Sequence, residues 1–199
     1  FLLADIKKLA STKVMFPAAT LSKRMFSSAP RRTKLWSFHK EKMGAQMVDF
    51  AGYHMPVKYP LGGLKEHLHC RASCGLFDVS HMGQVRVKGS DAARFLEKVT
   101  VVDTQALAPG QASLSLIMLE SGGIKDDCIV TKVSDDEYFV VLNAGCKETD
   151  LAHWAEHKTA DMDVGFHYSE DNSLVAVQGP KSQHLLERVL GLASGSLTQ

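Results

Sequence analysis

The sequence predicts an α+β fold in which a mostly antiparallel sheet packs against helices. Turn strings at residues 121–123 and 134–137 separate three successive strand-like runs, which are therefore expected to pair as a meander. Helical and strand-like runs also follow one another without the regular β-α-β alternation that builds a doubly wound parallel sheet. The 199 residues are 45% hydrophobic and 23% charged, as is usual for one globular domain or the beginning of a larger protein.

The individual elements are predicted from hydrophobic periodicity and from the glycines and prolines that interrupt it. Residues 34–43 have the pattern of an amphipathic helix ended by Gly44, and residues 46–63 that of a short strand followed by an irregular loop. A helix that begins at Leu64 is expected to end at Gly75. The further predictions are strands at 82–90, 113–119, 124–133, 137–142 and 173–180, and helices at 92–100, 146–158 and 181–191.

The composition argues against several classes of protein. The chain has 23 Lys and Arg residues against 22 Asp and Glu, and a net charge of +1 does not suit a nucleic-acid surface. No apolar run approaches the ~20 residues of a membrane-spanning helix, so no membrane partner is expected. Four cysteines are too few for a disulfide scaffold, and reduced thiols are expected.

The two ends of the chain carry separate expectations. Residues 15–32 contain four Lys or Arg residues, three Ser and no acid, which is the composition of a mitochondrial transit peptide. Residues 1–32 are therefore predicted to be a transit peptide, with Met15 as a candidate initiator preceded by leader; the alternative is a disordered basic tail. Residues 191–199 contain no closing element, so the sequence is expected to be truncated at its C-terminus.

A zinc site is weakly indicated by one short string. His67, His69, Cys70 and Cys74 lie close together in the sequence. Zinc sites usually take four ligands from two separated pairs, and no second pair follows here. No metal is therefore expected, and the cysteines are interpreted as small buried apolar residues.

Nucleophilic and nucleotide chemistry find little support. A cysteine nucleophile needs a histidine close in space, for which His54 and His81 are available, and nothing else in the sequence favours it. The glycine strings at 61–66 and 122–127 match neither the dinucleotide-binding nor the phosphate-loop fingerprint.

Asp78, Ser80 and His81 stand together in the string FDVSHMG at 77–83. They have the residue types of a hydrolytic triad, but side chains this close on an extended segment alternate in direction and rarely converge. A turn held by hydrogen bonds of Asp78 and the wall of a binding site both remain open interpretations.

Asp126 and Asp127 begin a run that otherwise has the pattern of a strand, where Asp is unfavourable. Neighbouring strand residues point to opposite faces, so at least one of the two carboxylates should point inward and needs a partner or a function. If strands 124–133 and 137–142 pair through the turn at 134–137, Asp127 and Asn143 face one cavity. A carboxylate beside a carboxamide suits a ligand with N–H donors and a carbonyl, such as a pterin.

Four strings, in this order and at these separations, carry a family resemblance. They are MVDFAGYHMPVKY at 47–59, GLFDVSHMGQV at 75–85, ESGGIKDDCIV at 120–130 and VVLNAG at 140–145, followed by VAVQGP at 175–180. Together they resemble the folate-binding N-terminal part of the aminomethyltransferase family, the T-proteins of the glycine cleavage system. The resemblance begins near Arg32 and stops short of the family's full length. Residues 33–199 are therefore predicted to be a folate-binding region truncated at its C-terminus.

The resemblance implies a reaction and a site. Members of the family transfer the one-carbon unit of the aminomethyl group on lipoylated H-protein to tetrahydrofolate, giving 5,10-methylenetetrahydrofolate and ammonia. Their key aspartate falls at Asp127, which is implied to be the catalytic residue that orients or activates the nucleophilic nitrogen of the folate. Met82 and Asn143 match residues that line the folate pocket. The implied location is the mitochondrial matrix, with tetrahydrofolate as substrate, H-protein as partner, and no metal, nucleic acid or membrane.

Two positions depart from the family pattern, and two other functions stay open. Tyr53 stands where the family often has Trp, and Leu114 where some members have a pocket tyrosine. One alternative is the folate-binding module of a dimethylglycine or sarcosine dehydrogenase-like protein, which predicts a flavoprotein domain upstream. The other is a non-catalytic folate-binding protein that serves the assembly of other proteins. The GGI-x-DD string at 122–127 favours the transferase.

Overall fold

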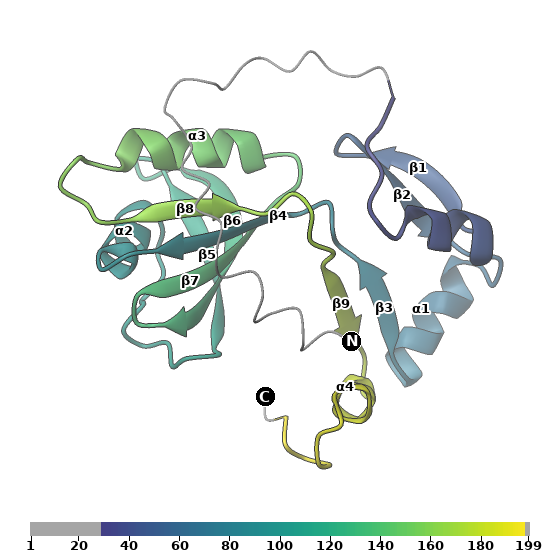
Figure 1. The fold of residues 1–199 in the computed structure, drawn as a ribbon. Helices are drawn as coiled ribbons and strands as arrows, with labels where there is room; N and C mark the ends of the chain where they lie inside the picture. Colours follow the sequence, from purple (N-terminus) through teal and green to yellow (C-terminus); the bar gives the residue numbers. More distant parts are fainter. Residues whose placement is uncertain (1–28, 198–199) are drawn as a thin grey trace.

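The computed structural model describes residues 29–197, so most of the predicted transit peptide lies outside the described residues. A five-stranded antiparallel sheet with the order β5-β6-β7-β4-β8 dominates the fold, and helices α2 and α3 pack against it (Figure 1). The strands are β4 (Gly83–Lys88), β5 (Ala112–Met118), β6 (Ile124–Ser134), β7 (Glu137–Leu142) and β8 (Gly165–Tyr168), and the helices are α2 (Ala92–Val99) and α3 (Lys147–His157). The prediction of an α+β fold with a mostly antiparallel sheet is confirmed.

One apolar layer holds this sheet and its two helices together. On α2, the apolar residues Ala92, Phe95, Leu96 and Val99 recur at helical spacing, and all four are buried. The ring of Phe95 meets the ring of Trp154 from α3 edge to face, with 6.0 Å between the centroids. Because full burial of a large apolar side chain contributes about 1.5–3 kcal/mol, this layer is the main source of stability for the sheet and fixes where its ends lie.

A second group of elements flanks the sheet. The hairpin of β1 (Gln46–Phe50) and β2 (Tyr53–Lys58) lies beside α1 (Gly63–Ala72), and the pair of β3 (Gly75–Asp78) and β9 (Val175–Gln178) lies between α1 and the large sheet (Figure 1). The segment η1 (Phe38–Lys42) and the helix α4 (Ser182–Leu190) complete this group. Within residues 29–197, no helix combines the length and the apolar character needed to cross a membrane.

Most departures from the local predictions lie in the flanking elements. Residues 53–58 form a second strand instead of an irregular loop, because Ala51 and Gly52 take positive φ angles of 48° and 77° and close a tight hairpin. The helix expected at 34–43 is present but shorter, at 36–42, and its last five residues form the π-helical turn η1. The short strands β3 and β8 are additional to the predicted elements.

Candidate functional site

The structure brings Met82, Asn143 and Asp127 to one end of the large sheet. In β4, β7 and β6, Gly83 lies opposite Leu142, and Leu142 lies opposite Cys128. Asp127 precedes Cys128 on β6, Asn143 directly follows the last residue of β7, and Met82 directly precedes the first residue of β4, so the three residues adjoin the same end of three neighbouring strands. The strand pairing that the sequence predicts between 124–133 and 137–142 is present and accounts for the placement of Asp127 beside Asn143.

The side chain of Asn143 contacts both aspartates. Its Nδ2 donates to Asp127 Oδ1 at 2.9 Å and lies 3.0 Å from Asp126 Oδ1, and the carbonyl oxygen of Asp127 is 3.2 Å away. A primary amide has two hydrogens, so three oxygens compete for them. Asn143 therefore fixes the direction of the Asp127 carboxylate, whose residue is exposed on the open face of the sheet.

Asp126 is the aspartate that points inward. Its Oδ2 is fully buried and accepts no hydrogen bond from an N–H or hydroxyl group of the described residues, and the same is true of both carboxyl oxygens of Asp150 on α3, a residue that is 0% exposed. Burial first, and then a hydrogen bond with Asp126, raise the pKa of Asp150 from 3.8 to about 7. Carboxylates only accept hydrogen bonds, so Asp126 and Asp150 can bond to each other only while one of them is protonated.

The contact of Asp126 with Asp150 explains why one of the two acids at the start of β6 points inward. The expectation that at least one carboxylate points inward is confirmed, and its partner is a third acid that supplies the missing hydrogen. Asp126 in turn lies within hydrogen-bond distance of Asn143, so the buried pair supports the amide that orients Asp127. Sequence reasoning missed Asp150, although an acid on the same helical stripe as the buried Lys147 and Trp154 is a usable signal.

The sheet face beside Asp127 is open and apolar. On β5 the buried residues are Ser115 and Ile117, whereas Leu114 is 70% exposed. Leu114 lies opposite Ile129 of β6, which is 42% exposed. Apolar side chains thus continue from Asp127 along the uncovered face, an arrangement suited to a flat heterocycle whose polar edge meets a carboxylate.

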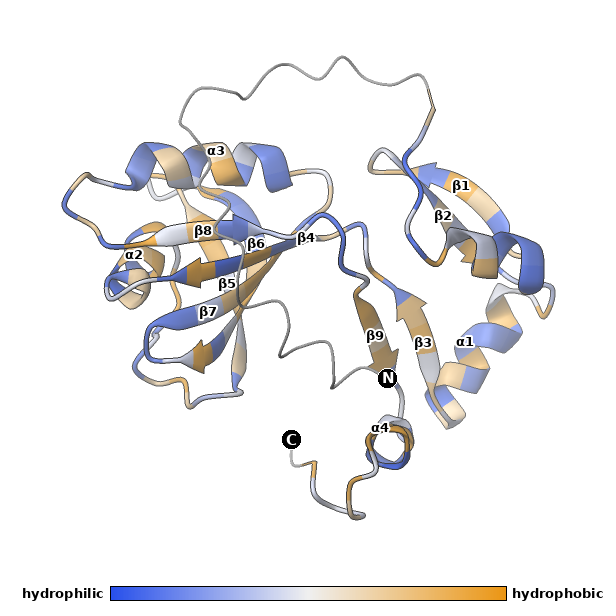
Figure 2. Ribbon diagram, viewed as in Figure 1, coloured by the Kyte–Doolittle hydropathy of each residue, from blue (hydrophilic) through white to orange (hydrophobic). Residues whose placement is uncertain are grey.

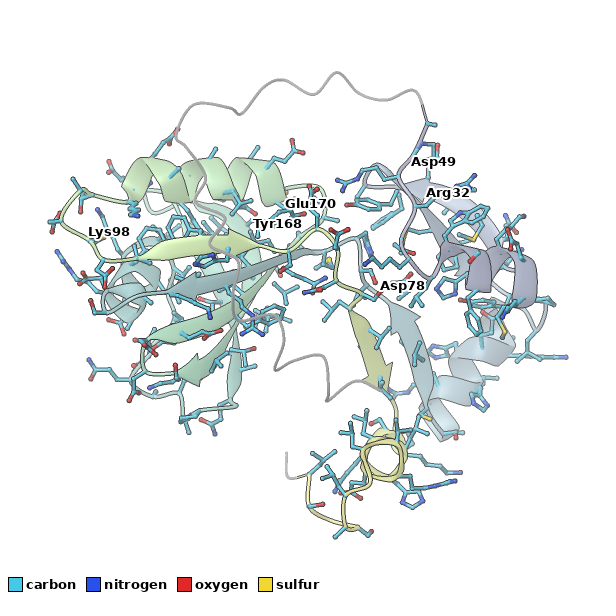
Figure 3. The ribbon with its side chains drawn as sticks, viewed as in Figure 1. Arg32, Asp49, Asp78, Lys98, Tyr168 and Glu170 are labelled. Carbon is cyan, nitrogen blue, oxygen red and sulfur yellow. The ribbon has the colours of Figure 1, made fainter. Side chains whose placement is uncertain are left out.

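The string around Asp78 forms a turn and not a triad. Asp78 accepts hydrogen bonds from the Ser80 backbone N–H at 3.0 Å and from Thr33 Oγ1 at 2.7 Å, and its Oδ2 lies 3.2 Å from His39 Nε2. Burial acts to raise the pKa of Asp78, but these hydrogen bonds outweigh it and hold the pKa below its ordinary value. Figure 3 shows Asp78 at the end of β3, on the side of the β1–β2 hairpin. The hydrogen-bonded turn that the sequence predicts at Asp78 is therefore present.

The histidines considered as partners for a thiol have other neighbours. The ring of His81 packs edge to face on Phe50 and Tyr53, and His54 Nδ1 accepts a hydrogen bond from Trp36 Nε1 at 3.0 Å. Burial is the largest factor that raises the pKa of Cys128 to about 12, and nearby acids raise it further. A thiol with so high a pKa is a poor nucleophile.

The string of His67, His69, Cys70 and Cys74 on and after α1 does not gather into a ligand set in the described part of the chain. Cys70 and Cys74 are free thiols, and Cys70 Sγ lies 3.6 Å from the carbonyl oxygen of Gln178. Within residues 29–197, the side chains that bring three ligand atoms together belong to a different helix, α3.

The fold and the group of Met82, Asn143 and Asp127 define an α+β ligand-binding domain with an acid–amide site at the end of its sheet. Residues 36–197 match the model of the family described as the GCVT N-terminal domain, and the chain belongs to this family. The match includes the whole of the large sheet and these three residues.

Relatives and a solved structure agree with this assignment. The chain is similar to the mitochondrial aminomethyltransferase of Dictyostelium discoideum, with 46% identity over 175 residues that cover 84% of this chain and 43% of that protein. It is 41% identical to the mitochondrial aminomethyltransferase of Solanum tuberosum over 84% of this chain and 43% of that protein. The crystal structure of glycine cleavage system aminomethyltransferase T from Bartonella henselae superimposes with a TM-score of 0.77 at 37% identity, covering 85% of this chain and 46% of that one. The chain thus spans less than half the length of these relatives.

Proposed function

We propose that this chain is the folate-binding N-terminal part of a glycine cleavage aminomethyltransferase, and that residues 33–199 belong to this region. The proposed reaction moves the methylene carbon of the aminomethyl group on lipoylated H-protein to tetrahydrofolate. Two carbon–nitrogen bonds form on the folate, while the bonds of that carbon to the amine nitrogen and to the lipoyl sulfur break. The products are 5,10-methylenetetrahydrofolate, ammonia and the dihydrolipoyl H-protein, so atoms balance without an added oxidant or reductant.

The observation that carries this proposal is the orientation of Asp127. Its carboxylate is held by Asn143 and exposed at the edge of an apolar sheet face. A pterin presents N–H donors on one edge and a flat aromatic surface, which match the carboxylate and the apolar face respectively. In this role Asp127 accepts a hydrogen bond from the folate and keeps its nucleophilic nitrogen directed at the incoming carbon, while Met82 and Asn143 line the same pocket.

The location and the partner belong to the same proposal. Two relatives are named as mitochondrial enzymes, and residues 15–32 have the composition of a transit peptide, so we infer that residues 1–32 direct the chain to the mitochondrial matrix. The lipoylated H-protein is the partner that the reaction requires.

Calorimetric titration of the full chain with tetrahydrofolate tests the proposal. We expect weak binding that Asp127→Asn weakens by about tenfold or more, because the amide replaces an acceptor of the ligand N–H groups with a donor. Asp49→Asn is the matched control, since Asp49 is an exposed aspartate on β1 (Figure 3), a strand outside the large sheet. Equal affinity in wild type and Asp127→Asn would refute the role of Asp127, and no binding to a folded chain would refute a folate site on these residues.

A further inference from the structure

The last two turns of α3 carry a group of potential metal ligands that the folate site does not use. His153, Glu156 and His157 occupy positions i, i+3 and i+4, which lie on one face of a helix. Each offers one ligand atom, and these three atoms all lie within 4.8 Å of one another. The two imidazole rings are 4.1 Å apart between centroids. A small adjustment of the side chains brings the three atoms to the spacing around one metal ion.

The hydrogen bonds of the two rings fix which nitrogens are free. His153 Nε2 lies 3.1 Å from the carbonyl oxygen of Met118, and His157 Nδ1 lies 2.8 Å from the carbonyl oxygen of His153. A carbonyl oxygen only accepts, so each of these ring nitrogens carries the proton. In the neutral rings, the lone pairs are therefore on Nδ1 of His153 and Nε2 of His157. An imidazole whose second nitrogen donates to a backbone carbonyl is the usual form of a metal-binding histidine.

The ligand types indicate the metal. Two imidazoles and one carboxylate form a set that Zn²⁺ binds in many proteins, with a water molecule in the fourth position. Glu156 is exposed and His157 is half-buried, so an ion reaches the group from solvent without any rearrangement of the core. His153 is buried and connects the group to β5 through Met118.

We propose that His153, Glu156 and His157 form a Zn²⁺-binding site on α3, with a solvent molecule as fourth ligand. The ion ties the last turns of the helix to the end of β5, because one of its ligands is bonded to the Met118 carbonyl. The site stands independently of the proposed folate site, since it uses none of Met82, Asn143 and Asp127.

Zinc titration of the full chain, freed of metal with a chelator, tests this proposal. We expect one Zn²⁺ per chain, an increase in Tm on binding, and a Co²⁺ complex with the visible absorption of a four-coordinate site. His157→Ala is expected to weaken binding by about tenfold or more, and Glu156→Gln to weaken it less. Circular dichroism of His157→Ala, together with the conservative His157→Gln, separates loss of the ligand from loss of the helix.

Two control variants make the assignment specific. His167→Ala removes an exposed histidine on β8, and the Cys70→Ser, Cys74→Ser double variant removes the rival ligands near α1. Both are expected to bind Zn²⁺ as the wild type does. Unchanged affinity in His157→Ala, or loss of binding in the cysteine double variant, would overturn the proposal, as would the absence of stoichiometric binding in the wild type.

Discussion

The sheet body and the flanking elements bury their apolar residues to very different extents. In the sheet body, residues 83–168, the side chains of Val85 and Trp154 are fully buried. In the flanking elements, residues 29–78 and 175–197, α1 has no buried residue and its Leu64 is 74% exposed. Leu76 and Phe77 of β3 are 56% and 47% exposed, and Figure 2 shows hydrophobic residues along β3 and β9.

This difference in burial indicates which region contributes most to the stability of the folded chain. The core cluster of the structure is made of residues of the sheet body alone, whereas several large apolar residues of the flanking elements are about half exposed or more. Contiguous exposed apolar surface commonly marks contact with other protein. The flanking elements are therefore expected to contribute little to the stability of the isolated chain.

Polar contacts join the two regions. The buried Lys147 of α3 donates from Nζ to the Tyr53 hydroxyl at 2.8 Å and to the His81 carbonyl oxygen at 3.3 Å. Arg31 also forms a surface ion pair of 3.8 Å with Glu170, both more than 40% exposed. Exposed pairs of this kind contribute little, so the buried Lys147 contacts fix the position of the hairpin.

The largest expected effect on stability comes from comparing the same substitution in the two regions. Phe95→Ala removes a fully buried ring from the sheet body and is expected to lower the free energy of unfolding by about 3–5 kcal/mol. Phe77→Ala makes the same change on the half-exposed β3 and is expected to cost about 1 kcal/mol or less. Urea unfolding of both variants measures the contrast. Equal losses would show that the flanking elements are as tightly packed as the core.

The second prediction concerns the one acid buried in the sheet body. Asp150 has a pKa near 3.8 when unfolded and about 7 when folded. Between these values the folded protein binds more protons, so its stability falls as pH rises through this window. Asp150→Asn has nearly the same shape, carries no charge and donates an N–H to Asp126.

We therefore expect the gain in free energy of unfolding caused by Asp150→Asn to be about 2–3 kcal/mol larger near pH 8 than near pH 5, because about two pH units of the window lie above pH 5. Urea titrations at the two pH values, with Asp49→Asn as an exposed control, provide the measurement. An equal effect of Asp150→Asn at both pH values would mean that Asp150 is ionised throughout.

The smallest expected effect on stability concerns the hydrogen bond of Lys147 to Tyr53, which joins the two regions. Tyr53→Phe removes the hydroxyl that accepts from Lys147 and leaves a buried ammonium with one acceptor fewer. The expected loss of stability is about 1–2 kcal/mol, and it should be accompanied by faster proteolysis in the β1–β2 hairpin, while the sheet body stays resistant. Cleavage that begins in the sheet body would contradict the division into two regions.

The parts of the fold that depend on neighbouring residues could be predicted from the sequence. The meander β5-β6-β7 and the helices α2, α3 and α4 follow from local periodicity and turn residues, and all are present. The pair β3–β9 could not be predicted in this way, because its two four-residue strands lie far apart in the chain. Proline is unusual within a strand, so the presence of Pro56 in β2 made a loop the more natural prediction for these residues.

In the candidate site, too, only the features that depend on neighbouring residues in the sequence could be predicted. The proximity of Asp127 and Asn143 follows from strand register, which the turn at 134–137 fixes. The place of Met82 beside them was expected only from the family resemblance, since no local pattern relates it to β6. Asp150 shares a helical stripe with Lys147 and Trp154, but a single acid on a helix is usually exposed, so only the structure shows that it contacts Asp126.

The side-chain amide of Asn143 lies between the exposed carboxylate of Asp127 and the inward-pointing carboxyl group of Asp126. If the proposed folate site is correct, a ligand N–H that bonds to Asp127 Oδ1 displaces one hydrogen of Asn143, which then bonds Asp126, 3.0 Å away, more fully. A stronger hydrogen bond from Asn143 to Asp126 weakens the one between Asp126 and Asp150, which is among the causes that raise the pKa of Asp150. Ligand and proton are consequently linked, each altering the affinity for the other by the same factor. Calorimetry in two buffers of different ionisation enthalpy should therefore record hydrogen ions released as the site fills.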